Sequence, residues 1–231
     1  MIKWSRVCGI AIFCTMLGMV GGCSKDTSTV SEVMEEIKTT EVSDTEDDKL
    51  NMDDVILQVG DASITYREVL FYVYQVKRDY EDEFGKEVWE VALKDGNSFE
   101  SYAIEELLRQ LTEIHIICEQ AKKDNVALTQ VENAEIENRA NKFLSNVTEE
   151  EAQKYGFVKE SVENIFKEHA IAKKMYDKEV QSVVDTTNKG TEEARKKMQS
   201  EHFQSVYTEW SKQYSAEVSV KLWQKIEMKM N

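Results

Sequence analysis

The sequence predicts a mostly α-helical protein with a small β-element that joins an N-terminal strand to the C-terminal segment. Its 231 residues include no proline and only 9 glycines, so few residues interrupt a helix. Good helix formers such as Glu, Lys, Gln, Ala and Leu are abundant. A capping box, in which Thr or Asn is followed three residues later by Glu, recurs along the chain and marks helix starts. Together these features argue against an all-β fold.

The first elements are predicted to be a hairpin that leads directly into a helix. Residues 55–59 form a β-branched run that predicts a strand, because glycine and aspartate at 60–61 stop it. Residues 63–64 then predict a short returning strand. Residues 65–68 form the first capping box, and the apolar residues that follow recur at helical spacing as far as Tyr80.

The middle of the chain predicts three further helices. A long one is expected to begin at the capping box of residues 97–100 and to end near residue 123, where two lysines suit the negative end of a helix. Capping boxes at residues 129–132 and 148–151 predict one more helix and a short one.

The C-terminal part predicts two helices and a closing strand. Residues 158–184 and 191–214 have helical composition and are separated by a short polar break. Residues 217–223 alternate like an edge strand. This strand is expected to pair with the first one, so that Leu57 and Val220 become neighbours.

Residues 1–22 are predicted to be a lipoprotein signal peptide. Lys3 and Arg6 give it a positive start, and the apolar stretch that follows is short for a membrane-spanning helix. Two glycines precede Cys23 and resemble a lipobox, where a peptidase cuts after Gly22 and Cys23 carries a diacylglyceryl group and palmitate. This resemblance implies a lipoprotein outside the cytoplasm, anchored to the bacterial cell membrane by lipid. No other cofactor is predicted.

Two alternatives remain open for this segment: an uncleaved anchor helix that begins near Trp4, and an ordinary signal peptide with a coincidental cysteine.

Residues 23–53 are poor in large apolar side chains and rich in Ser, Thr, Asp and Glu, which predicts a disordered, acidic tether. Such a tether would hold the folded domain, residues 54–231, clear of the lipid surface.

Composition and charge exclude several classes of function. The formal net charge is −15, and no basic aromatic stripe offsets it, so nucleic acid is not expected as a partner. Outside the signal and the lipidation point the chain has one cysteine, Cys118, whose place on an apolar helical stripe predicts core packing. His115, His169 and His202 lie on three predicted helices without metal-ligand spacing. No metal site and no catalytic residue is therefore predicted.

Four stretches, residues 58–68, 107–131, 155–176 and 207–226, resemble the N-terminal peptide-binding domain of the SurA and PrsA family of extracytoplasmic foldases. That SurA N-like domain has also been likened to the chaperone domain of trigger factor. The resemblance implies a membrane-tethered, chaperone-like protein that binds unfolded or newly exported polypeptides through apolar contacts, without catalysis.

One departure from the family concerns the prolyl isomerase module. In members with that activity a parvulin domain of about a hundred residues lies before the last helix, whereas here the interval is little more than residues 181–190, too few for a core of that kind. Isomerase activity is therefore not carried over. A peptidyl-prolyl isomerase and a dedicated membrane-assembly subunit remain the alternatives.

The strongest candidates for peptide contact lie on the first helix, where residues 69–74 are apolar on every side. Either a second layer of protein covers them, or they line a groove for an apolar partner. Aromatic and methionine side chains suit adaptable binding of varied segments. The candidate residues are Phe71, Tyr72 and Tyr74 and, on weaker grounds, Trp89, Tyr102, Met175 and Tyr176.

Overall fold

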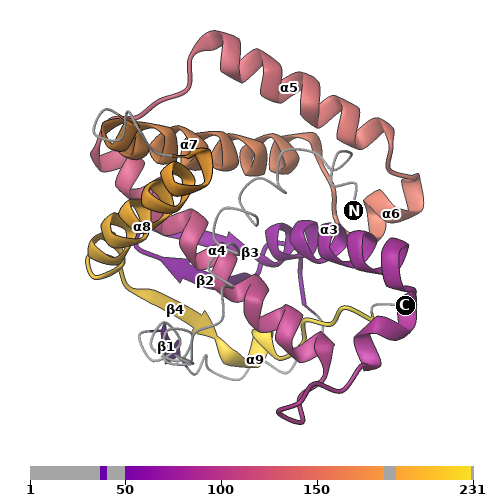
Figure 1. The fold of residues 1–231 in the computed structure, drawn as a ribbon. Coiled ribbons are helices and arrows are strands. Elements are labelled where there is room, and N and C mark those ends of the chain that lie inside the picture. Colours follow the sequence, from indigo (N-terminus) through magenta and orange to yellow (C-terminus); the bar gives the residue numbers. More distant parts are fainter. Residues whose placement is uncertain (1–36, 41–49, 185–190, 230–231) are drawn as a thin grey trace.

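The computed structural model describes residues 37–40, 50–184 and 191–229. Within these residues the chain forms seven α-helices, one 3₁₀-helix and a small sheet (Figure 1). The mostly helical class with joined ends, which the sequence predicts, is confirmed. In chain order the elements are β1 (Ile37–Thr40), β2 (Val55–Val59), β3 (Ala62–Thr65), α3 (Tyr66–Phe84), η2 (Lys86–Glu90), α4 (Phe99–Lys123), α5 (Gln130–Ser145), α6 (Glu149–Lys154), α7 (Lys159–Val184), α8 (Glu192–Ser211), β4 (Ala216–Ser219) and α9 (Val220–Trp223).

The predicted signal peptide, its cleavage point at Gly22 and the lipidated Cys23 lie outside the described residues, as does most of the predicted tether. Eight residues of the predicted tether are described, 37–40 and 50–53, and the first four form strand β1 instead of irregular chain. The description resumes at Leu50, ahead of the expected domain boundary, and Asp53 forms an ion pair of 3.0 Å with Arg67 on α3. Among the helices of the described ranges, none is both long enough and apolar enough to traverse a bilayer.

The sheet joins the two ends of the described chain. Its strand order is β1-β4-β2-β3; β2 pairs antiparallel with both β3 and β4, and β1 runs parallel to β4. The predicted pairing of the strand at residues 55–59, now β2, with the C-terminal strand β4 is therefore confirmed. The expectation that Val220 lies in the strand next to Leu57 is wrong, because β4 ends at Ser219 and Leu57 lies opposite Val218.

The last predicted strand is shorter than the sequence suggested. Strand β4 ends at Ser219, and Val220–Trp223 form the helical turn α9, which is closed by a 2.9 Å hydrogen bond from the Gln224 amide to the Val220 carbonyl. Val220 and Trp223 are three residues apart, so a helical turn places both on one side, where they pack on the core. The apolar residues that looked like one face of a strand thus pack on the core from one side of a helical turn.

Two of the predicted capping boxes form and two do not. The side chains of Thr129 and Thr148 each accept a bond from the backbone amide three residues on. The carboxylates of Glu132 and Glu151 in turn accept a bond from the backbone amides of Thr129 and Thr148. At the start of α3 the side chain of Thr65 makes no capping bond. At α4 the cap is Ser98, and the carboxylate of Glu100 instead accepts bonds from the backbone amides of Met228 and Lys229 near the C-terminus.

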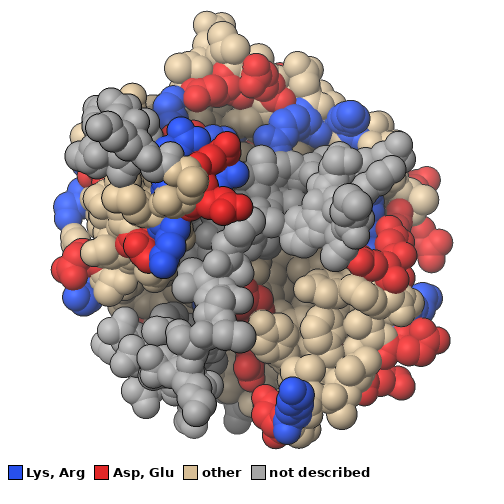
Figure 2. All heavy atoms as spheres, in the orientation of Figure 1, with Lys and Arg blue, Asp and Glu red and all other residues tan. Residues whose placement is uncertain are grey.

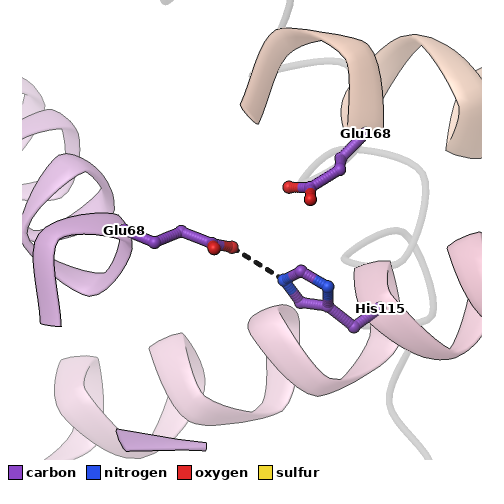
Figure 3. A group of neighbouring side chains, drawn as sticks. All are labelled: Glu68, His115 and Glu168. Atoms are coloured by element: carbon purple, nitrogen blue, oxygen red, sulfur yellow. Dashed lines mark hydrogen bonds and ion pairs between the residues drawn. The ribbon is translucent and has the colours of Figure 1, made fainter. Parts of the chain in front are cut away.

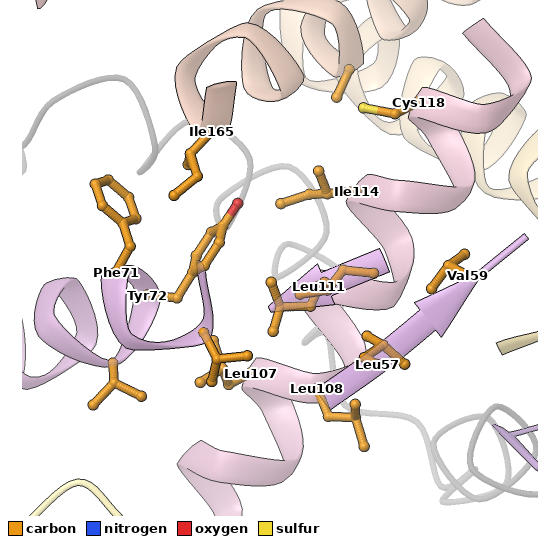
Figure 4. Packing of buried hydrophobic residues seen from close by; sticks show 14 of the residues in the cluster. Leu57, Val59, Phe71, Tyr72, Leu107, Leu108, Leu111, Ile114, Cys118 and Ile165 are labelled. Carbon is orange, nitrogen blue, oxygen red and sulfur yellow. The ribbon is translucent and has the colours of Figure 1, made fainter. Parts of the chain in front are cut away.

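Helix α4 lies at the centre of the domain. It contacts α7, α8, η2 and β2 (Figure 1), and its residues 111–121 are buried on every side. Figure 4 shows the layer between α4 and α3: Phe71 and Tyr72 point from α3 toward Ile165 on α7, with Leu107, Leu111 and Ile114 of α4 beside them. A helix so enclosed must pair its polar side chains inside the protein.

Candidate functional site

The first half of α3 is core, not groove. Phe71, Tyr72 and Tyr74 are only 1%, 4% and 5% exposed. The second layer of protein considered for this helix is present, so these side chains offer no surface to a peptide. Trp89 and Met175, the weaker candidates, are also fully buried.

An aromatic cluster explains this burial. The Phe71 ring lies 5.2 Å from that of Phe143 on α5 and 5.8 Å from that of Phe166 on α7, centroid to centroid. The Tyr74 ring packs on Tyr155 and Phe157, between α6 and α7, at 5.0 and 5.1 Å. Helices α5 to α7 therefore cover the side of α3 that the sequence left without a partner.

Both tyrosines in this layer also direct their hydroxyl groups to buried or half-buried partners. The Tyr72 hydroxyl lies 3.0 Å from Nε2 of His169, which is itself buried. Burial, together with the positive charge of Arg139, lowers the pKa of His169 to about 4, so this ring is neutral at physiological pH. His169 therefore packs in the core as a neutral ring.

The other two candidate residues lie nearer the surface. Tyr176 on α7 is partly buried against Phe203 of α8, with 4.9 Å between ring centroids. Tyr102 is 51% exposed. Of the seven predicted contact residues, only Tyr102 presents a large apolar surface to solvent.

Tyr102 belongs to a continuous aromatic surface that the sequence reading missed. The ring of Tyr80 lies 6.1 Å from that of Phe84 and 5.1 Å from that of Phe99, which in turn lies 6.1 Å from Tyr102. Phe84 is 59% exposed, and Val91 is exposed beside the same elements. We call these five residues, Tyr80, Phe84, Val91, Phe99 and Tyr102, the aromatic surface.

The short helix η2 supports this surface from beneath. Trp89 stacks on Phe99 at 5.7 Å, and its indole N–H donates a 2.9 Å bond to Glu81 on α3. Gly85 takes a positive φ of 78°, which allows the chain to turn from α3 into η2. A buried tryptophan with its one polar atom satisfied fixes the loop that carries Val91.

Acidic side chains edge the aromatic surface. Asp82, Glu83, Glu87 and Glu90 are exposed on α3 and η2. Figure 2 shows uncharged side chains at the lower right, where Figure 1 places the end of α3 and η2, with acidic groups along the rim. The surface is therefore apolar in its middle, and acidic side chains outnumber basic ones at its border, where Glu90 pairs with Lys229 at 3.5 Å.

A second feature lies near the start of α3: a carboxylate–histidine cluster of Glu68, His115 and Glu168, in which His115 is buried and both glutamates are partly buried. The three residues come from α3, α4 and α7, and their side chains converge (Figure 3). Nε2 of His115 lies 2.7 Å from Oε1 of Glu68. One ligand-type atom from each residue lies within 4.8 Å of the others. His115 is 3% exposed.

Burial and neighbouring charges shift the pKa values of this cluster. Burial raises the pKa of the Glu168 carboxyl to about 7, and the neighbouring Glu68 charge adds to the rise. Burial by itself lowers the pKa of His115, but the bond to Glu68 and its charge outweigh burial, so the pKa is raised. Oε2 of Glu168 is buried and has no hydrogen-bond partner among the described residues. Three ionisable groups thus share a site with one unsatisfied oxygen.

Cys118 lies beside this cluster but is not part of it. Its thiol is buried and donates a long, 3.6 Å contact to the main-chain oxygen of Glu168. Burial and the charge of Glu168 raise the pKa of the thiol well above its ordinary value, so it stays protonated. The prediction that Cys118 packs in the core is confirmed.

Sequence reasoning assigned Glu68 to a capping box and did not single out Glu168. The signal that was available is the occurrence of Glu113, His115 and Glu119 within an apolar stretch of α4, since polar groups there require buried partners. Their partners come from helices distant in sequence, so spacing along the chain does not reveal them.

Comparison with known proteins adds no assignment: no family model, no curated protein and no solved structure matches this chain.

Proposed function

We propose that this protein is a lipid-anchored, extracytoplasmic chaperone-like protein that binds segments of unfolded or newly exported polypeptides without catalysis. The observation that supports this proposal best is the aromatic surface, on which Phe84 and Tyr102 are each more than half exposed. Exposed aromatic side chains in contact with one another are uncommon on a surface that has no partner. The SurA and PrsA resemblance of the sequence belongs to this proposal and points the same way.

The occupant that fits this surface is an extended, non-native segment with alternating apolar and basic side chains. Aromatic rings accept apolar side chains of many shapes. The acidic rim attracts lysine and arginine and repels acidic segments. Residues 78–105 carry more acidic than basic side chains, which favours such clients over neutral ones.

The test uses the full-length lipidated chain in nanodiscs and measures how far it suppresses the aggregation of several unrelated unfolded proteins. The variant Phe84→Ser/Tyr102→Ser removes the two most exposed rings of the surface. We expect this double variant to lose most of the suppression, because its apolar contact area is lost.

The matched control is Val131→Ser/Val158→Ser, which removes two exposed apolar side chains from α5 and from the start of α7. It should retain full activity. Equal loss in both double variants, or no suppression by the unaltered chain at stoichiometric excess, would contradict the proposal. Recovery of one stoichiometric partner from membranes would instead indicate a dedicated assembly subunit.

The lipid anchor has its own test. We expect Cys23→Ala to release the protein from membranes or to leave an unprocessed precursor, because a single modified residue provides the attachment. Membrane fractionation and intact mass measure both outcomes. Normal signal removal together with unchanged membrane attachment would contradict the anchor.

A further inference from the structure

The carboxylate–histidine cluster has the donor set and spacing of a metal site. One nitrogen from His115 and one oxygen each from Glu68 and Glu168 lie within 4.8 Å of one another. Ligands bound about 2.0–2.2 Å from one zinc ion lie roughly 3–4 Å apart, so small side-chain rotations would bring all three onto one ion. The three helices that carry them pack together, which fixes the site on rigid elements (Figure 3).

A second, independent observation points to a missing cation. Oε2 of Glu168 is buried and receives no hydrogen bond from any described residue. A buried carboxylate oxygen without a donor is destabilising, and native proteins rarely leave one. Lys122, about two turns after His115 on α4, is bound to Glu119 at 2.5 Å. Within the described part of the chain no lysine or arginine forms an ion pair with Glu68 or Glu168.

We propose that Glu68, His115 and Glu168 bind one zinc ion. An imidazole nitrogen with two carboxylate oxygens is a ligand set typical of zinc, whereas magnesium and calcium prefer oxygen ligands alone. Three protein ligands leave a fourth position, which a water molecule can fill. The ion holds α3, α4 and α7 together at the point where the core is polar.

The experiment uses the full chain, stripped of metal with a chelator and titrated calorimetrically with zinc chloride in the presence of excess magnesium. Magnesium occupies weak sites on the acidic surface and leaves the zinc-specific site to be measured. We expect saturation at one equivalent, a higher thermal midpoint with zinc than with magnesium alone, and a visible absorption band when cobalt replaces zinc.

Single substitutions test whether these residues are the zinc ligands. Glu168→Gln and, separately, His115→Gln should weaken zinc binding by at least about tenfold, because each removes one of three ligands. The matched control is Glu113→Gln: Glu113 is also a buried glutamate with one unpartnered oxygen, on the same helix as His115, but it pairs with Arg109 and lies outside the cluster. It should bind zinc within about twofold of the unaltered chain.

Circular dichroism establishes that each variant is folded before titration, and Glu68→Gln, whose amide still reaches His115, replaces any variant that is not. Absence of saturable zinc binding in the unaltered chain would overturn the proposal. So would equal affinity in Glu168→Gln and Glu113→Gln, since the ion would then bind elsewhere. Neither result bears on aggregation suppression, because the aromatic surface lies at the other end of α3.

Discussion

Both halves of α3 carry aromatic side chains, but these side chains have opposite surroundings. Residues 69–74 are almost wholly apolar or aromatic and buried, while Tyr80 and Phe84, two and three turns further on, are exposed. The first half is covered by α5, α6 and α7, whereas the ring of Tyr80 in the second half packs on Trp89 of η2 and on Phe99 at the start of α4. Aromatic content therefore does not distinguish core from binding surface. The elements that pack on the helix decide it.

The largest expected difference comes from the same substitution made in each half. Phe71→Ala should lower the free energy of unfolding by about 3–5 kcal/mol, because it removes a ring that packs on four others. Phe84→Ala should change the same free energy by less than about 0.5 kcal/mol. Chemical denaturation of both variants measures the two values. Similar losses would mean that the second half is core as well.

A smaller effect is expected from the hydroxyl of Tyr72. Tyr72→Phe leaves the buried Nε2 of His169 without its partner, which should cost about 1–3 kcal/mol of unfolding free energy. Tyr102→Phe, in the exposed region, is the control and should have almost no effect because water replaces the lost bond. A loss in Tyr102→Phe as large as that in Tyr72→Phe would contradict the contrast between the two regions.

Helix α6, which helps to cover the buried first half of α3, is expected to be less stable at acidic pH. The backbone amide and hydroxyl of Thr148 bind Glu151 and lower its pKa below the ordinary value of 4.5. A lowered pKa in the folded state stabilises the fold above the unfolded-state pKa, and this contribution is lost as pH falls through the folded-state pKa. Helix α6, which packs on Tyr74, should therefore lose protection below about pH 4.

Hydrogen-exchange protection factors along α6, which correct for the intrinsic pH dependence of exchange, measure this loss. Glu151→Gln removes the titrating group and should show lower protection at neutral pH with a flatter pH dependence. If the unaltered chain and Glu151→Gln lose protection in parallel as pH falls, a group other than Glu151 determines the pH dependence of α6.

Local signals in the sequence predicted most helix boundaries, and the exceptions share one cause. Glu132 and Glu151 turn back to cap their own helices as expected. Glu68 instead binds His115, and Glu100 binds the backbone near the C-terminus. A capping box is a contact within one turn, so the sequence cannot show when a distant partner takes the same carboxylate.

The sites were less predictable than the fold. Tyr102 was identified because aromatic side chains suit adaptable binding, but Phe84 and Val91 were missed because their exposure depends on which elements pack beside them. The carboxylate–histidine cluster required the relative positions of three helices, which no spacing along the chain encodes. The apolar stretch at residues 69–74 left two interpretations open, and packing by the second layer decides between them.

Strand β4 has a consequence for how the molecule is made. It pairs with β1 on one side and with β2 on the other, although both partners lie near the beginning of the chain. During synthesis from the N-terminus the hairpin of β2 and β3 therefore waits with an open hydrogen-bonding edge until Ala216–Ser219 emerges. Until β4 pairs with it, this edge is open to unrelated strands, so pairing with the last strand is the step that closes the sheet.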